Sequence, residues 1–164
     1  MSLPFRLLLR VRYGECDQQG IVFNARWAEY VDVAAGEFSR ALFGANASSG
    51  FAGARSTSEG SEESIDPTQT GTDWKLVKQT LEWKASGRYD DVLDIRVRCV
   101  RVGTTSFTLA TEFRRHPDDA VLVTAETVYV LIHPALGTKR RVPDQQRIAF
   151  ERGAPGVTVN QAGI

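Results

Sequence analysis

This chain of 164 residues has only two cysteines, two histidines and no formal net charge. Each of these features excludes some classes of protein. The two cysteines, Cys16 and Cys99, show no CxxC spacing and no disulfide framework, so we expect buried, reduced thiols in a cytoplasmic protein. Lysine plus arginine and aspartate plus glutamate number 20 each, so the formal net charge is zero and nucleic acid is not an expected partner. His116 and His133 belong to no metal-ligand cluster or Ser-His-Asp arrangement, so we expect neither a metal nor another cofactor.

The chain also lacks a long hydrophobic run, although 42% of its residues are hydrophobic. Arginines interrupt the apolar N-terminal stretch MSLPFRLLLRVRYGE, which has no cleavage-site pattern, so it is predicted to be neither a signal peptide nor a membrane anchor. A length of 164 residues is typical of one domain with its own core. We therefore expect a single domain over residues 1–150 and no membrane partner.

Two kinds of periodicity mark the N-terminal part of this domain. Apolar residues alternate with arginines from Phe5 to Tyr13, which predicts a half-buried strand. In the next element, a helix, Asn24 is a favourable N-cap and Gly44 a favourable stop. Gly36, inside this helix, costs about 1 kcal/mol relative to alanine and indicates either close packing against a sheet or a tolerated defect. The apolar stripe of the helix has spacings of three and four and consists of Trp27, Val31, Ala34, Ala35, Phe38 and Leu42.

The second half of the chain is rich in predicted strands. These strands, joined by short turns as in an antiparallel meander, are residues 74–85, 92–102, 106–113 and 120–133. Residues 45–72, rich in serine, glycine and threonine, are expected to form a flexible insertion. The tail after Pro143, including residues 151–164, is expected to be poorly ordered. An α+β fold, in which a curved antiparallel sheet wraps one long helix, is the simplest way to bury the apolar stripe.

Two separated motifs carry a resemblance to a known family. The first, VRYGECDQQGIVFNARWAEYVDVAAGEF, contains Asp17, a glycine three residues later (Gly20), the apolar IVF run and an aromatic residue early in the helix. The second, YDDVLDIRVRCVRVGTTSF, contains the YDDVL entry to a strand and the pair Ser106–Phe107. With these motifs the chain resembles the hotdog-fold acyl-CoA thioesterases, in particular the 4-hydroxybenzoyl-CoA thioesterase type. The resemblance covers most of the chain apart from residues 45–72 and the C-terminal tail.

The resemblance implies a hotdog fold, with homodimers or homotetramers that form through sheet edges and active sites at the dimer interface. It implies hydrolysis of an acyl-CoA or aroyl-CoA to the carboxylic acid and free coenzyme A, which is part of the substrate and not a cofactor. In the family, the residue that matches Asp17 is the catalytic carboxylate, acting as nucleophile or as general base. Backbone N–H groups at the start of the central helix polarise the thioester carbonyl.

Elementary chemistry agrees with this arrangement. The start of a helix has unpaired N–H donors and about half a positive elementary charge. Donors near Phe23 and Asn24 could hold the oxyanion that forms when a thioester is attacked, and the turn at Gly20 can bring Asp17 toward the same point. Because a thiolate leaves readily at neutral pH, a carboxylate and an oxyanion site suffice. Asp17 would activate water, or attack the carbonyl to give a mixed anhydride that water then opens.

The same residues also have simpler interpretations. Asp17 fits a D-x-x-G turn, Asn24 fits a helix cap, and Trp74 fits core packing better than the wall of an acyl pocket. Cys16 has no activating histidine near it in the sequence and is interpreted as a small buried filler. Alternative carboxylates on the helix, better suited to solvated or interface positions, are Glu29, Asp32 and Glu37.

The coenzyme A end of the site departs from the family pattern. Relatives often carry arginine or lysine at the turn before the SF pair, for contact with the phosphates, whereas this chain has GTT there. Hydroxyls and a turn amide can still bind phosphate, with less charge. The alternatives to an acyl-CoA thioesterase are therefore a non-catalytic hotdog protein that binds acyl thioesters and a thioesterase for acyl carrier protein. Arg88 also fits a plain surface position. The candidate substrate-binding residues are Gly20, Trp74, Arg88, Thr104, Thr105 and Ser106.

Overall fold

The computed structural model describes residues 4–44, 73–133 and 136–164, so the predicted insertion at 45–72 lies outside the described residues. No helix in these described ranges is long and apolar enough to cross a membrane. In chain order, the elements are β1 (Phe5–Arg10), the 3-10 helix η1 (Tyr13–Glu15), α1 (Arg26–Phe43), β2 (Asp73–Trp83), β3 (Val92–Val102), β4 (Ser106–His116), β5 (Ala120–Ile132), α2 (Asp144–Arg152) and β6 (Thr158–Gln161).

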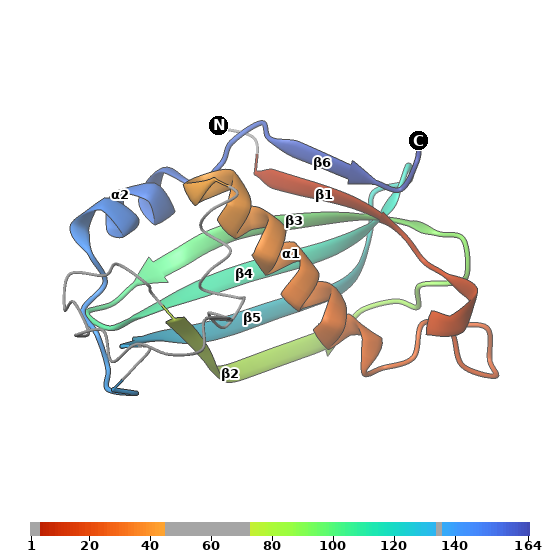
Figure 1. Cartoon of the computed structure of the whole chain (residues 1–164). Coiled ribbons are helices and arrows are strands. Elements are labelled where there is room, and N and C mark those ends of the chain that lie inside the picture. The colour runs from red at the N-terminus through yellow and green to blue at the C-terminus, as the bar shows by residue number, and fades with distance from the viewer. Residues whose placement is uncertain (1–3, 45–72, 134–135) are drawn as a thin grey trace, which may run out of the picture.

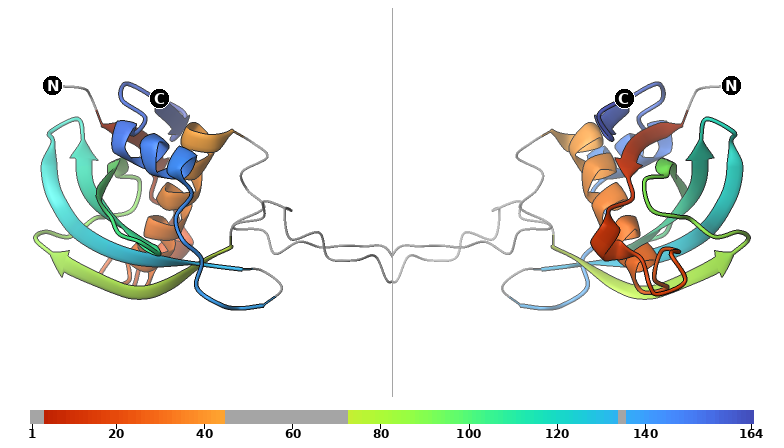
Figure 2. Two further views of the ribbon diagram at one scale, coloured as in Figure 1. Left: turned by 90° about the vertical axis from the view of Figure 1, so that its left-hand side faces the viewer. Right: turned by 90° about the vertical axis from the view of Figure 1, so that its right-hand side faces the viewer.

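The strands of the described residues form one six-stranded sheet in the order β2-β5-β4-β3-β1-β6. Neighbouring strands are antiparallel except β1 and β6, which are parallel. The sheet curves around α1, which lies along its concave face (Figures 1 and 2). The predicted α+β hotdog fold is therefore confirmed. The meander is limited to β3, β4 and β5, because β2 pairs with β5 at the edge of the sheet and not with β3.

The apolar stripe of α1 faces the sheet and forms the centre of the core. The Trp27 ring meets Phe113 of β4 edge-on, with ring centroids 5.2 Å apart. Rings packed in this way bury large apolar areas and contribute strongly to stability. The predicted stripe is confirmed, because all of its members are buried: Trp27, Val31, Ala34, Ala35, Phe38 and Leu42.

The start of α1 differs from the prediction. The N-cap residue is Ala25 rather than Asn24, and no side chain caps the helix. The Phe23 N–H donates back to the Glu15 carbonyl at 3.0 Å, and the Arg26 N–H donates to the Phe23 carbonyl at 2.9 Å. The chain therefore stays in a loop up to Ala25, and the prediction that Asn24 caps the helix is wrong.

Gly36 inside α1 and Gly44 at its C-cap have different roles. Gly44 ends the helix as predicted, with a φ of 81° and its N–H bonded to the Arg40 carbonyl at 2.8 Å. Gly36 does not pack closely against the sheet, because a Cβ atom added there would meet only the Arg40 guanidinium, at 3.9 Å. Of the two interpretations of Gly36, close packing is wrong and a tolerated defect remains.

β1 is shorter than the alternation of the sequence predicts. The strand ends at Arg10, and the Val11 N–H then bonds to the Asp91 carbonyl at 2.9 Å. The chain turns into η1 at this point. Tyr13, predicted on the buried face, is consequently 82% exposed.

The C-terminal tail forms regular structure, contrary to the prediction. Phe150 of α2 is 2% exposed and packs in the main core. β6 adds to the sheet beside β1, with Val159 opposite Leu7. Only one residue of α2 is buried and β6 is four residues long, so neither element carries enough periodic pattern to be predicted.

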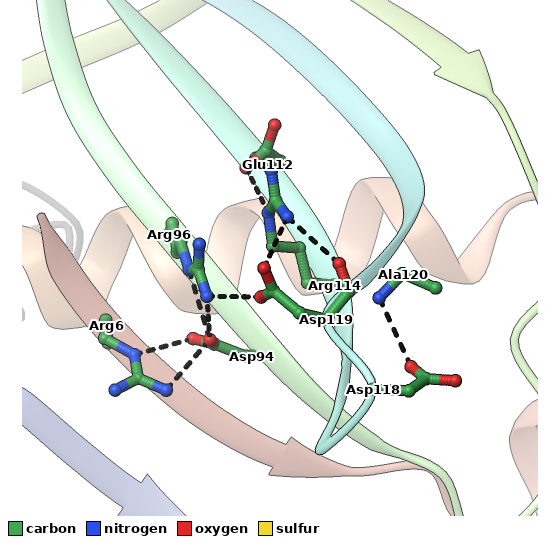
Figure 3. Close-up of polar contacts among 8 residues, drawn as sticks. All are labelled: Arg6, Asp94, Arg96, Glu112, Arg114, Asp118, Asp119 and Ala120. Carbon is green, nitrogen blue, oxygen red and sulfur yellow. Dashed lines mark hydrogen bonds and ion pairs between the residues drawn. The ribbon is translucent and has the colours of Figure 1, made fainter.

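Ion pairs cover the face of the sheet opposite α1 (Figure 3). Asp94 of β3, 3% exposed, accepts hydrogen bonds from Arg6 at 2.9 Å and from Arg96 at 2.8 Å. Arg96 and Arg114 also contact Asp119 in the β4–β5 turn, at 2.6 and 2.8 Å. Burial alone would raise the pKa of Asp94, but the hydrogen bonds from Arg6 and Arg96 lower it below its usual range. The buried carboxylate is therefore fully compensated by its partners.

Candidate active site

Asp17 lies at the start of a tight hairpin between η1 and α1. Cys16 and Val22 form an antiparallel bridge at its base. The Asp17 N–H donates to the Ile21 carbonyl at 2.9 Å, and the Gly20 N–H donates to the Asp17 carbonyl at 3.0 Å. Gly20 has a φ of 72°, a conformation that favours glycine. The hairpin thus explains why a glycine follows Asp17 by three residues.

The side chain of Asp17 is held at one oxygen. Oδ1 accepts the Gln19 N–H at 2.8 Å, which is an Asx turn. Within the part of the chain that the structure describes, Oδ2 has no hydrogen-bond partner, and the residue is partly exposed. Asp17 therefore forms a turn with one carboxylate oxygen, while the other accepts no hydrogen bond from the described residues.

The loop before α1 contains the predicted oxyanion donors. The Phe23 N–H is already bonded to the Glu15 carbonyl. Among the described residues, no partner is found for the N–H groups of Asn24 and Ala25, which come directly before the first turn of α1. Free N–H groups at the start of a helix favour a negative charge. Of the two predicted residues, Asn24 has the available N–H group.

Arg88 lies at the same end of the molecule as Asp17. It forms a bridge with Ile21 of the hairpin, and its N–H donates to the Asp91 carboxylate at 2.8 Å. Two exposed tyrosines, Tyr13 and Tyr89, lie beside this region and meet edge-on with ring centroids 5.9 Å apart. Sequence reasoning did not select the two tyrosines, because they are distant in the chain and follow no periodic pattern.

The predicted substrate-binding residues at the start of β2 and at the β3–β4 turn lie at the opposite end of the sheet, near α2 (Figure 1). They are Trp74, Thr104, Thr105 and Ser106. Trp74 packs against Phe107 with ring centroids 4.8 Å apart, as expected for a core residue. In the β3–β4 turn, the carbonyls of Thr104 and Thr105 accept the N–H groups of Val142 and Leu131, both at 2.9 Å. Ser106 begins β4 directly after this turn. The protomer therefore does not bring these residues together with Asp17.

A basic segment that the sequence analysis missed lies beside the β3–β4 turn. Lys139 forms a bridge with Ile132, and the next residue, Arg140, donates its N–H to the Leu131 carbonyl at 2.8 Å. Arg147 of α2 donates to the carbonyls of Val102 and Gly103 at 3.2 and 2.8 Å. Positively charged residues of a later part of the chain, in the segment 139–141 and in α2, therefore lie beside this turn. The run KRR at 139–141 was the available signal.

The helical acids of α1 are arranged differently from Asp17. Glu29 pairs with Arg26 at 2.6 Å, and Glu37 pairs with Arg40 at 2.6 Å. Asp32 has no ion pair with another described residue, and desolvation by the surrounding atoms raises its pKa although it lies at the surface. The described residues contain no cluster of three or more metal-ligating side chains.

A cavity of about 620 Å³ lies at the α2 end of the molecule. Its walls include Phe38, Cys99, Thr111, Phe150 and Ala154. None of the predicted site residues lines it. The cavity is therefore separate from the Asp17 hairpin.

A curved, mostly antiparallel sheet wrapped around one long helix is the architecture of the hotdog class of proteins. The chain belongs to the thioesterase superfamily, whose family model matches residues 19–122. Asp17 lies just before the matched residues. No curated protein matches the chain in sequence.

Solved structures of several thioesterases share the fold. A thioesterase superfamily protein from Jannaschia sp. CCS1 has a TM-score of 0.75 at 16% identity, over 93% of this chain and 94% of that one. A 1,4-dihydroxy-2-naphthoyl-CoA thioesterase from Synechocystis has a TM-score of 0.70 at 15% identity, over 89% and 94%. A gentisyl-coenzyme A thioesterase has a TM-score of 0.66 at 21% identity, over 89% and 98%. At these identities, the similarity is one of fold.

Proposed function

We propose that the protein hydrolyses an acyl-CoA or aroyl-CoA thioester to the carboxylic acid and free coenzyme A. The observation that carries the proposal is that, among the described residues, Oδ2 of Asp17 and the N–H groups of Asn24 and Ala25, which follow the Asp17 hairpin directly, have no hydrogen-bond partner. A carboxylate and an oxyanion site are the two groups that thioester hydrolysis requires. Membership of the thioesterase superfamily supports the same reaction.

In the proposed reaction, the amides of Asn24 and Ala25 stabilise the oxyanion that forms on the thioester carbonyl. Asp17 removes a proton from water, which attacks the carbonyl carbon, or attacks it directly to form a mixed anhydride that water opens. The carbon–sulfur bond then breaks and coenzyme A leaves as a thiolate. The reaction needs neither a metal nor another cofactor.

An aromatic acyl group is the proposed substrate class. Two of the proteins that share the fold are named as thioesterases of aroyl-CoA compounds, a dihydroxynaphthoyl-CoA and a gentisyl-CoA. The exposed rings of Tyr13 and Tyr89 beside the Asp17 hairpin add an apolar surface that could contact such a group.

A second copy of the chain would complete the site. β2 is an edge strand whose outer side pairs with no described strand, and it exposes Leu76, Val77 and Trp83. Antiparallel pairing of two β2 strands about a twofold axis would place the β3–β4 turn of one copy at the end where the other carries Asp17. A homodimer, alone or within a tetramer, therefore accounts for the split between the two groups of predicted residues.

The phosphates of coenzyme A are proposed to bind at the β3–β4 turn of the second copy. Thr104, Thr105 and Ser106 offer hydroxyl groups there, and the segment 139–141 adds positive charge close by. Arg88, beside the Asp17 hairpin, is the other candidate cation. Substitution of Arg141, which is exposed, should therefore raise KM for CoA thioesters and leave kcat unchanged.

The test is release of free thiol from a panel of aliphatic and aromatic acyl-CoA thioesters, with the wild type beside Asp17→Asn. The wild type is expected to hydrolyse at least one aroyl-CoA, and the variant to lose about a hundredfold or more in kcat. An inactive wild type across the panel would contradict the proposal. Binding of a CoA thioester without hydrolysis would then favour a non-catalytic binding protein, and hydrolysis only of acyl carrier protein thioesters would favour the other alternative.

A further inference from the structure

The carboxylate of Glu15 lies buried between the Asp17 hairpin and α1. The residue is 6% exposed, and its carboxylate accepts hydrogen bonds from two residues. Arg12 donates its N–H to Oε2 at 2.7 Å and its guanidinium to Oε1 at 2.8 and 2.6 Å. The Tyr30 hydroxyl donates to Oε2 at 2.7 Å. Burial alone would raise the pKa of Glu15, but these bonds lower it below its usual range, so the carboxylate is charged at neutral pH.

The main chain of Glu15 also holds the hairpin. Its N–H donates to the Arg12 carbonyl at 3.0 Å, and its carbonyl accepts the Phe23 N–H at 3.0 Å. The bridge between Cys16 and Val22 follows directly. Both arms of the hairpin that carries Asp17 therefore start from contacts made by this one residue.

Tyr30 connects Glu15 to the body of α1. The tyrosine is 2% exposed, and its ring lies against Trp27 with centroids 5.7 Å apart, so the hydroxyl has a fixed position. A buried charge with its partners contributes little net stability compared with apolar residues of the same size. Stability alone therefore does not account for a charged carboxylate at this position.

We propose that Glu15 and Tyr30 are positioning residues, which fix the Asp17 carboxylate relative to the N–H groups of Asn24 and Ala25. The inference rests on the proposed function, because it assigns those groups to one reaction. Asp17 belongs to the hairpin, and the N–H groups belong to the turn that leads directly into α1. The Glu15–Tyr30 hydrogen bond joins the hairpin to α1. A displacement of about 1 Å between reacting groups can cost about a hundredfold in rate.

Tyr30→Phe is the first test, because it removes the hydroxyl and keeps the ring. We expect kcat for the best thioester of the panel to fall about tenfold, with KM changed less than about twofold. The matched control is Arg96→Met, which also removes a donor to a buried carboxylate, that of Asp94, on the opposite face of the sheet. Loss of kcat in both variants would show a general effect of instability and would overturn the proposal.

A double-mutant cycle separates positioning from a structural role. If Tyr30 acts through Asp17, its replacement should have less than about a twofold effect on the residual activity of Asp17→Asn. A purely structural effect would lower the rate by the same factor in both backgrounds. Additive losses would therefore contradict the inference.

The reactivity of Cys16 gives a measurement that does not depend on hydrolysis. Its Sγ lies 3.9 Å from the Arg12 carbonyl at the base of the hairpin. In a Cys99→Ala background, alkylation of Cys16 by iodoacetamide, corrected for the thiolate fraction, should be several-fold faster in Tyr30→Phe, because the hairpin opens more often. Faster alkylation in a protein that hydrolyses no thioester would confirm the anchoring of the hairpin and refute the proposed function. An active wild type with unchanged kcat and alkylation in the variant would refute the positioning role.

Discussion

The Phe150 ring of α2 stacks on Phe107 of β4, with ring centroids 4.3 Å apart and an angle of 24° between their planes. The rings of Trp74 and Phe43 also pack against the Phe150 ring, with centroid distances of 5.6 and 5.4 Å. The contact attaches the C-terminal segment to the core directly beside the β3–β4 turn. The segment that supplies Arg147 to that turn is thus held by aromatic packing.

Truncation of Phe150 tests this attachment. Phe150→Ala should lower the free energy of unfolding by about 3–5 kcal/mol, because a ring that is 2% exposed leaves a cavity that neighbours fill poorly. Ile148→Ala is the control on the same helix, since Ile148 is 63% exposed and should change stability by less than about 0.5 kcal/mol. Urea denaturation measures both. Equal, small effects would mean that α2 does not dock on the core.

The fold could be predicted wherever the chain has a long periodic pattern. The stripe of α1 and the alternation in residues 92–102 gave the helix, the meander and their packing, because a buried face needs regular spacing. The pattern failed at short elements. β6 has only four residues, and it forms by pairing with β1, which is more than a hundred residues away in the chain.

The candidate site was predictable only in part, for a related reason. Asp17 and Gly20 lie in one hairpin and are adjacent in sequence, so their relation follows from local turn geometry. The contact of Glu15 with Tyr30 spans 15 positions and a change of direction in the chain, so no spacing rule indicates it. Likewise, the basic segment 139–141 lies beside Thr104 because it pairs with the end of β5, and this pairing has no signal in the local sequence.

The glycine in α1 offers a prediction of increased stability. Gly36→Ala should raise the free energy of unfolding by about 0.5–1 kcal/mol, because the new Cβ meets nothing closer than 3.9 Å and alanine favours the helix. Gly87→Ala is the contrasting variant, since its Cβ would lie 3.2 Å from Trp27 and from Val22 and should destabilise the protein. Thermal and urea denaturation compare the two. A loss of stability in Gly36→Ala would restore the close-packing interpretation.

The two functions of Asp17 can be separated by paired substitutions. Asp17→Asn keeps an oxygen that accepts the Gln19 N–H, so its stability should stay within about 0.5 kcal/mol of the wild type. Asp17→Ala loses this bond and should cost about 0.5–1.5 kcal/mol. Both variants should lose activity to the same extent. If activity instead followed stability across the pair, Asp17 would be a turn residue alone.

Acid should weaken the ion pairs on the outer face of the sheet. The pKa of Asp94 is lower in the folded protein than in the unfolded chain, so its contribution is complete above the unfolded pKa and is lost as pH falls through the folded pKa. Asp94→Asn should therefore be less stable than the wild type by about 1–3 kcal/mol at neutral pH. The difference should narrow as the pH is lowered below about 5, toward and below the usual pKa of an aspartate. Urea titrations at several pH values measure it, and a difference independent of pH would contradict the assignment.

The proposed pairing of two copies through β2 leads to a prediction that joins assembly with activity. Val77 is 57% exposed at the bulge of this edge strand, where the register with β5 shifts between Leu76 and Lys78. In the proposed dimer, Val77→Lys would bury two ammonium groups near the twofold axis without partners. The dissociation constant of the dimer should therefore rise at least a hundredfold, which corresponds to about 3 kcal/mol. The matched control is Val100→Lys, because Val100 is also exposed and lies at a comparable bulge, in β3. This substitution should leave the assembly unchanged.

Sedimentation velocity and thiol release should be measured on the same samples of both variants. Because one copy is proposed to supply Asp17 and the other the β3–β4 turn, the Val77→Lys monomer should retain its fold but show a strongly raised KM for CoA thioesters. Raising the protein concentration until the dimer re-forms should restore the wild-type KM, which a local defect in the strand could not do. A fully active monomer would place the whole site within one copy and would remove the reason for joining the two ends of the sheet.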